Sequence, residues 1–140
     1  MIILDTNVLS ALMSRIPDRQ VIAWLDKQPR TSVWTTSVTV LEIRFGLQTM
    51  AIGKRRMALA QAFETVLADK IDRRIAPIDM AAAEQAADLM AVRHQKGRPG
   101  DLRDTMIAGI VLACQATLAT RNTSHFEDLS LPFINPWAGE

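Results

Sequence analysis

The sequence predicts an α/β domain in which helices cover both faces of a parallel sheet. Three observations lead to this fold class. Short apolar or β-branched runs alternate with longer segments along the chain, the longer segments place apolar residues three or four positions apart, and cap or turn residues separate the two kinds of segment. Strands that alternate with helices are joined by right-handed crossovers, which make neighbouring strands parallel.

Short runs of apolar or β-branched residues predict the strands. The first run, MIIL, ends on Asp5, and the second, SVWTT, is rich in side chains that favour an extended backbone. The last run is expected to add an edge strand. The expected strands span residues 1–4, 32–36, 74–78, 117–120 and 131–134.

Apolar residues at helical spacing predict the helices. They are expected over residues 8–13, 18–28, 37–50, 54–70, 79–96 and 101–114. Ser37 is expected to cap the third helix, and Pro17, Pro29 and Gly53 interrupt the pattern. The apolar faces expected for the last three helices are Leu59, Phe63, Val66 and Leu67; Ala82, Ala86, Leu89 and Met90; and Ile107, Ile110, Val111 and Cys114.

Length and composition limit the class of protein. The 140 residues fit one domain, residues 1–140, and 49% hydrophobic with 22% charged residues is typical of a globular chain. The net charge of +1 means that any affinity for nucleic acid must come from a local patch. One cysteine excludes an internal disulfide and a cysteine-based zinc cage. No basic leader with a long apolar span is present, so we expect a soluble, cytoplasmic protein that does not enter a membrane.

Three acidic residues stand where a parallel sheet collects its ligands. Asp5 follows the first strand, and Glu42 and Asp104 occupy matching places later in the chain. Each also has a structural interpretation, because Asp5 can cap a helix, residues 39–42 fit a capping box, and Asp104 can favour a helix N-terminus.

Their positions on the helices favour a shared site. Asp104 lies one turn before Ile107, on the same face as the apolar stripe of that helix. Glu42 lies between Val38 and Phe45 in an apolar row. An unpaired buried carboxylate costs several kcal/mol, whereas a shared cation would neutralise all three. Oxygen ligands without a His/Cys cluster indicate Mg²⁺ or Mn²⁺ rather than zinc.

Four segments together resemble the PIN domain, and specifically the toxin ribonucleases of VapBC-type toxin–antitoxin pairs. They are ILDTNVLS at 3–10, SVTVLEIRFGL at 37–47, GRPGDLRDTMIAG at 97–109 and ATRNTSHFEDL at 119–129. The resemblance implies a five-stranded parallel sheet in the order 3-2-1-4-5. It also implies an Mg²⁺- or Mn²⁺-dependent endoribonuclease with catalytic and metal-binding roles for Asp5, Glu42 and Asp104.

The same resemblance implies partners. A cognate antitoxin is expected to cover the active site, the chain is expected to form a homodimer, and DNA is expected to be contacted only through the antitoxin. The apolar sides of helices 18–28 and 54–70, with Trp24 and Phe63, fit either a groove for an antitoxin helix or ordinary core packing.

One position departs from the family pattern. Many PIN domains have a fourth acid where this chain has Asn122, whose amide oxygen can accept a hydrogen bond but has no negative charge. We therefore expect one tightly held ion centred on Asp5 and Asp104, with a second ion recruited by the RNA phosphate.

Basic residues near the acidic segments are candidates for binding the substrate. Arg44, Arg103 and Arg121 can pair with phosphates, although each also fits a solvated surface charge, and we expect at least one to border the pocket. His125 is expected to pack against Phe126 rather than to act in catalysis.

Two other functions remain possible at this stage. A strand followed by an acid also begins the aspartyl-nucleophile phosphatases, but Asp5-Thr6-Asn7 lacks their second aspartate. A catalytically silent RNA-binding or regulatory module is the other alternative, suggested by Asn122. No motif fixes which RNA would be bound or cut.

Overall fold

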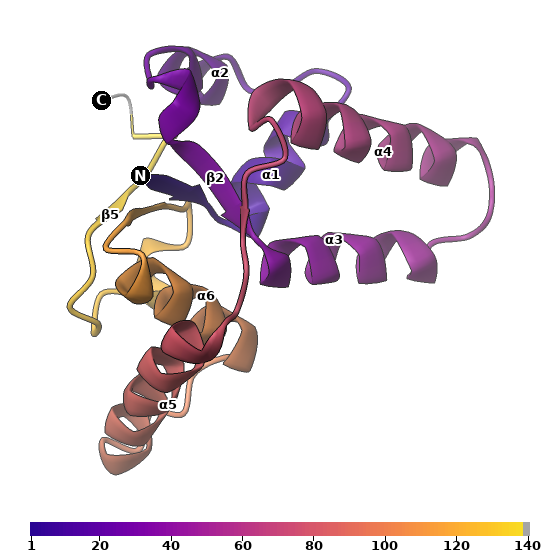
Figure 1. Cartoon of the computed structure of the whole chain (residues 1–140). Helices are drawn as coiled ribbons and strands as arrows, with labels where there is room; N and C mark the ends of the chain where they lie inside the picture. Colours follow the sequence, from indigo (N-terminus) through magenta and orange to yellow (C-terminus); the bar gives the residue numbers. More distant parts are fainter. Residues whose placement is uncertain (139–140) are drawn as a thin grey trace.

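β1 (Ile2–Leu4) is the central strand of a five-stranded parallel sheet within residues 1–138, which the computed structural model describes (Figure 1). The strand order is β3-β2-β1-β4-β5, as the resemblance implied. Ile3 pairs with Trp34 on one side and with Leu118 on the other. The remaining strands are β2 (Val33–Thr36), β3 (Ile75–Ala76), β4 (Thr117–Ala119) and β5 (Phe133–Ile134).

All six expected helices are present within the described residues, with ends shifted by a few positions. They are α1 (Thr6–Met13), α2 (Arg19–Asp26), α3 (Ser37–Thr49), α4 (Lys54–Thr65), α5 (Met80–Gln95) and α6 (Leu102–Ala113). A π-helical turn, η2 (Val66–Lys70), extends α4, and 3-10 turns form at η1 (Arg30–Ser32) and η3 (Thr123–His125). None of these helices is long and apolar enough to span a bilayer.

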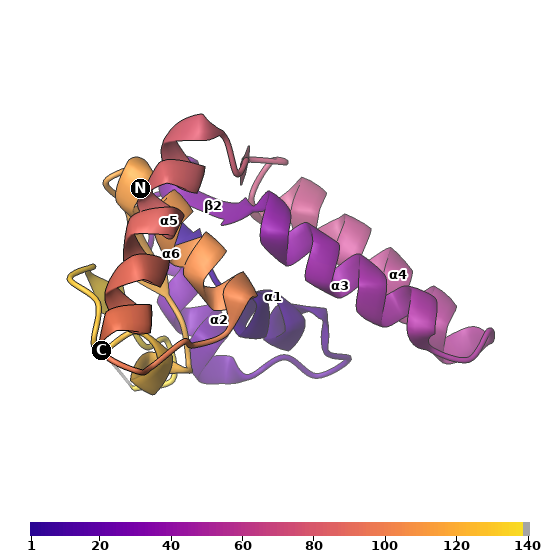
Figure 2. The same cartoon turned by 90° about the horizontal axis from the view of Figure 1, so that it is seen from below.

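Helices cover both faces of the sheet, which confirms the predicted fold class. Side chains alternate along a strand, so Leu4 belongs to one core cluster and Ile3 to another. The first cluster packs against α1, α2 and α4, and the second packs against α5 and α6. In Figure 2, α3 and α4 extend together away from the sheet.

The first core cluster decides between the two interpretations of Trp24 and Phe63 in favour of core packing. Trp24 and Phe63 are 4% and 2% exposed, so they belong to the core and do not form a groove for an antitoxin helix. Both belong to the same cluster as Leu4 of β1 and Val33 of β2, so α2 and α4 pack on this face of the sheet.

Three expectations from the sequence are wrong. Thr36, not Ser37, caps α3 by accepting a hydrogen bond from the Thr39 backbone N–H at 3.0 Å, because the strand runs directly into the helix. Cys114 is exposed because α6 ends one residue earlier and the apolar stripe stops there. On α5, Met90 is 46% exposed, and the buried position one turn later is Arg93.

Gly109 sets how closely α5 and α6 approach. A Cβ atom at this position would lie 2.6 Å from the Ala82 carbonyl oxygen and 2.9 Å from the Ala86 nitrogen. Because these are backbone atoms of a packed helix, they cannot move aside independently.

We therefore expect Gly109→Ala to destabilise the fold by about 1–3 kcal/mol, although alanine favours a helix. Urea unfolding measures this loss. Gly46→Ala is the matched control, because a Cβ atom there meets nothing within 4 Å. Equal stability of the two variants would contradict this account of the α5–α6 contact.

Candidate active site

The structure brings four of the expected residues to one pocket. Asp5, Glu42, Asp104 and Asn122 line a cavity of about 230 Å³, together with Thr6, Asn7 and Ser10. Asp5 follows β1, Asn122 follows β4, and Glu42 lies on the helix that begins directly after β2. The pocket therefore lies at the carboxyl edge of the sheet, where segments far apart in the sequence meet.

Asp5 is both a helix cap and the most buried acid of this pocket. Its side chain is 3% exposed. One oxygen accepts the Thr6 backbone N–H at 2.8 Å, and the other accepts the Thr120 hydroxyl at 2.7 Å and the Asn7 amide at 3.2 Å. The capping interpretation is thus correct for Asp5, but it does not exclude a place in the pocket.

Glu42 is held by a chain of threonine hydroxyls. Thr6 donates to Glu42 Oε1 at 3.2 Å, and Thr6 Oγ1 lies 3.0 Å from Thr39 Oγ1. Because Thr6 has one hydroxyl proton and gives it to Glu42, Thr39 is the donor to Thr6. Thr36 in turn donates to Thr39 at 3.3 Å. This chain fixes one carboxylate oxygen of Glu42.

The sequence-based account of the surroundings of Glu42 is partly wrong. The alternative interpretation of residues 39–42 as a capping box is ruled out, because Thr36 caps α3. Phe45 is 62% exposed, since that side of α3 projects away from the sheet, and Ile43 faces the core instead. The Glu42 side chain is 20% exposed and reaches the pocket from the edge of the covered face.

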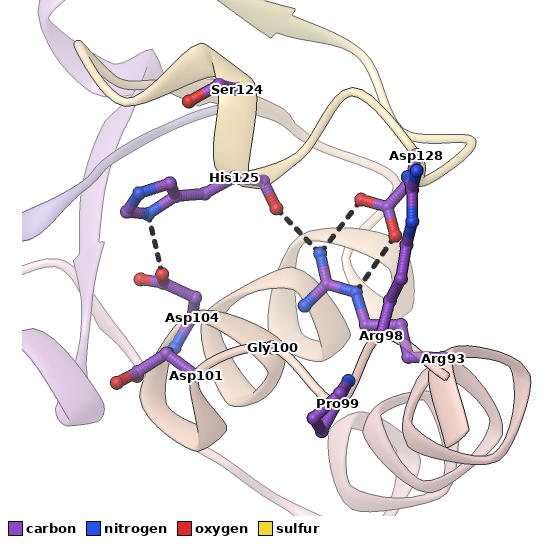
Figure 3. Close-up of a pocket in the computed structure, with 9 residues that line it drawn as sticks. All are labelled: Arg93, Arg98, Pro99, Gly100, Asp101, Asp104, Ser124, His125 and Asp128. Carbon is purple, nitrogen blue, oxygen red and sulfur yellow. Dashed lines mark hydrogen bonds and ion pairs between the residues drawn. The ribbon is translucent and has the colours of Figure 1, made fainter. Parts of the chain in front are cut away.

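Asp104 lies in the first turn of α6, which is capped by Asp101. Its Oδ2 is 2.9 Å from His125 Nδ1, and its side chain is 21% exposed (Figure 3). The expected neighbour of His125, Phe126, is present, and the contact with Asp104 is an additional one that the sequence did not predict. The His125 ring does lie near Phe126, with centroids 6.4 Å apart, but it is half exposed and points at Asp104.

One of the three expected arginines borders the acidic residues. Arg103 Nη1 lies 4.0 Å from Glu42 Oε2, and its side chain is 48% exposed. Arg121 is directed elsewhere, with its guanidinium 4.9 Å above the Trp137 ring. Arg44 is exposed and is not among the residues that line the pocket.

Comparison with known proteins identifies the family. The model of the PIN domain matches residues 2–130. The chain belongs to the PIN-domain family. It is 41% identical to the VapC ribonuclease Y4jK of Sinorhizobium fredii over 137 residues, and this alignment covers 98% of each chain. It is also 31% identical to the toxin FitB of Neisseria gonorrhoeae, over 98% of this chain and 99% of that one.

Solved structures agree with this assignment. The structure of FitAB bound to an IR36 DNA fragment superposes with a TM-score of 0.87 at 31% identity, covering 100% of this chain and 98% of the other. The DNA-bound VapBC of Salmonella typhimurium has the same fold, with a TM-score of 0.78 over 96% of this chain and 97% of that one, at 23% identity. The resemblance seen in the sequence to PIN domains of the VapC type is confirmed.

A buried arginine, Arg93, holds segments of this PIN domain together next to Asp104 and His125, and the apolar pattern of the sequence did not point to it. Arg93 is 4% exposed and donates to both oxygens of Asp128, at 3.1 and 3.0 Å. It also donates to the His125 carbonyl at 2.6 Å (Figure 3). A further hydrogen bond goes to the Thr105 hydroxyl at 3.1 Å. Arg93 thus ties α5 and α6 to the turn that presents His125.

We expect Arg93→Met to destabilise the protein by about 3 kcal/mol and to lower activity. The loss arises because Thr105 and His125 lose a donor and Asp128 loses its cation. Chemical denaturation measures the loss, and Arg19→Met, on the exposed side of α2, is the matched control. Unchanged stability would show that Arg93 is not a structural brace.

The pocket of this PIN domain disfavours the ionised forms of Asp5 and Glu42. Burial is the largest cause of the raised pKa of Asp5; the hydrogen bonds from Thr120 and Thr6 oppose it, and the Asp104 charge adds to it. Burial also raises the pKa of Glu42, against the Thr6 hydrogen bond and the Arg103 charge. A cation bound in the pocket would therefore stabilise the ionised form of both carboxylates.

Metal-free protein is therefore expected to become more stable as the pH falls from about 7 toward 4.5, the ordinary value for Glu42. The folded chain takes up protons before the unfolded chain does, so the cost of the two buried charges disappears. Below 3.8 the sign reverses, because hydrogen bonds from arginines lower the pKa of Asp72 and Asp128. Thermal melts in chelator measure this profile. Melting temperatures that fall steadily from neutral pH would contradict it.

The donor set suits a hard cation, although the carboxylates do not form a closed cage. Within residues 1–138, no group of three or more His, Cys, Asp and Glu stands close enough to hold a metal ion. The pocket nevertheless gathers three carboxylates with the side chain of Asn122, and its walls are otherwise hydroxyl and amide groups. Oxygen donors of this kind fit Mg²⁺ or Mn²⁺, which keep several waters rather than requiring a complete protein cage.

Proposed function

We propose that this PIN domain is a metal-dependent endoribonuclease and the toxin of a toxin–antitoxin pair. The convergence of Asp5, Glu42 and Asp104 in one pocket is the observation that carries the proposal. The pKa values of two of these carboxylates, Asp5 and Glu42, are raised. Gathering three carboxylates lowers the stability of the fold by mutual repulsion, so their convergence is better explained by a bound cation than by a structural role. The relatives named VapC ribonuclease and toxin FitB support the same function.

Asp5 and Asp104 would hold the ion, Mg²⁺ or Mn²⁺, with Asn122 as a weak additional ligand. A bound cation of this kind supplies charge neutralisation at the phosphate and lowers the pKa of water. The hydrogen bonds to Asp5 fix the direction of its carboxylate, and His125 does the same for Asp104.

Glu42 would take a proton from the attacking water. Burial raises the pKa of Glu42, which makes its carboxylate a stronger base than an exposed glutamate. The Thr6 hydroxyl occupies Oε1, so Oε2 remains for the reaction. Arg103, which is half exposed and lies near this oxygen, is the candidate for binding an RNA phosphate. Arg44 and Arg121 would contact the RNA only at nucleotides further from the cut.

We include an antitoxin in the proposal, because a similar solved structure, VapBC-5 from Mycobacterium tuberculosis, is a member of the VapBC family of toxin-antitoxin systems. A groove of about 1300 Å³ runs between α1, α3 and α4 and ends at Glu42 and Arg103. Its floor is apolar and its rim is basic, so an amphipathic acidic segment of the antitoxin would fit it and cover the active site. A homodimer, contact with DNA only through the antitoxin, and action in the cytoplasm complete the proposal.

Total RNA incubated with the purified protein tests this function. We expect new RNA ends in Mn²⁺ or Mg²⁺, none in chelator and none with Asp5→Asn. Mapping the ends identifies the target RNA. Binding of RNA without cleavage would instead favour the silent module, and a phosphoenzyme on Asp5 would favour the phosphatase.

A further inference from the structure

A second cavity adjoins the acidic pocket and is not used by the proposed chemistry. It has a volume of about 400 Å³ and lies between loop 97–100 and the turn η3 (Figure 3). Asp104 lines both cavities, so the two are neighbours at this residue. The other polar residues that line it are Arg93, Arg98, Asp101, Ser124, His125 and Asp128.

Part of this lining is already satisfied and part is not. Arg93 and Asp128 bind each other, and Asp104 binds His125 Nδ1. Within residues 1–138, by contrast, the Arg98 guanidinium, the Ser124 hydroxyl and Oδ2 of Asp101 make no hydrogen bond. The Arg98 charge helps to lower the pKa of Asp128, and Asp101 Oδ1 lies 3.8 Å from Arg103 Nε, so both groups have a charged neighbour but keep hydrogen-bonding atoms for a ligand.

The charges of the lining indicate what the ligand is. A phosphate group would meet the carboxylates of Asp101, Asp104 and Asp128, while Arg93 is already neutralised, so a second phosphate is disfavoured. A nucleobase presents both donors and acceptors and has flat faces that stack on histidine or guanidinium planes. His125, half exposed on the wall of the cavity, and Arg98 offer such planes.

We propose that this cavity holds the nucleobase next to the scissile phosphate of the RNA strand. The inference rests on the proposed ribonuclease function and deepens it. Guanine matches the free groups best, because arginine pairs with its O6 and N7 acceptors and a carboxylate accepts from its N1 and N2 donors. Arg98 and Asp101 take these two roles, and His125 stacks on the ring.

Abasic substitution tests the cavity. In a single-stranded RNA with one mapped cut, each base within two positions of the cut is replaced in turn by an abasic residue. At one of these positions, the abasic residue should lower kcat/KM about 10- to 100-fold relative to the intact RNA. At that position guanine should be cut faster than the other three bases. Equal rates for all four bases would overturn the guanine assignment, and no abasic penalty above about twofold at any position would overturn the cavity.

A variant links the effect to this cavity. Arg98→Gln should remove most of the penalty of the sensitive abasic position, whereas the matched control Arg19→Gln, which lines none of the cavities, should keep it. A penalty that survives Arg98→Gln contradicts the proposal. The same oligonucleotides are compared for binding by fluorescence anisotropy with Ca²⁺. If no metal supports cleavage, the ribonuclease proposal fails by itself, and the cavity is then tested by binding alone, with a short single-stranded RNA in which every position is made abasic in turn.

Discussion

Replacing Asp5 by asparagine is expected to lower RNA cleavage by about a thousandfold or more while the fold remains intact. Asparagine keeps one oxygen for the Thr6 N–H and preserves the shape of the residue, but it removes the charge that would hold the cation. In the metal-free protein the melting temperature should be equal or higher, because burial raises the pKa of Asp5 and its charge is a cost in the folded state.

The matched control is Asp18→Asn. Asp18 caps α2 as Asp5 caps α1, and asparagine is an equally good cap, but Asp18 does not line the acidic pocket. Asp104→Asn should behave like Asp5→Asn. Glu42→Gln should also lower activity, and a retained tenth or more would give Glu42 a supporting role. Cleavage that survives Asp5→Asn, or a clearly lower melting temperature without metal, would contradict these assignments.

Removing divalent metal is expected to have an effect of similar size on the wild-type protein. Chelator should reduce cleavage to background, and Mn²⁺ or Mg²⁺ should restore it, because without a cation the three carboxylates of the pocket repel the RNA phosphate and leave its charge without a counterion. Metal should also stabilise the fold by about 2.7 kcal/mol at a hundredfold excess over its Kd. Asp5→Asn should lose this stabilisation. Cleavage that persists in chelator would refute the metal dependence.

The fold was accessible from the sequence because it depends on local patterns. Each apolar or β-branched run and each cap acts within a few residues, and the alternation of strands and helices then leaves few topologies. The three acids were also found in this way. Asp5 ends a strand, and Asp104 continues the buried stripe of Ile107, so both could be placed at the carboxyl edge before any coordinates were known.

The two main contacts that the sequence did not reveal join distant segments. His125 and Asp104 are 21 positions apart, and nothing local predicts that Nδ1 of the ring lies beside this carboxylate. Arg93 occupies a buried position on α5 that the pattern would give to an apolar residue, and its partner Asp128 lies 35 positions away. An arginine at a stripe position is the signal that would have revealed it.

The position of Glu42 illustrates a prediction that was right for an incomplete reason. Glu42 does reach the pocket, but Phe45 is not part of an apolar row, because α3 projects with α4 beyond the sheet. The residue is oriented instead by Thr6 and Thr39, which come from two different helices. Such hydroxyl chains form only after the helices have packed together.

Direct measurement of Mn²⁺ binding tests the central claim that these carboxylates hold a hard ion. Electron paramagnetic resonance of free Mn²⁺ during titration with the protein reports how much ion is bound. We predict saturable binding of about one ion to the wild type and to Asp18→Asn, and its loss in Asp5→Asn and Asp104→Asn. Binding that is the same in all four proteins, or absent from a wild type that still cuts RNA, would contradict the account.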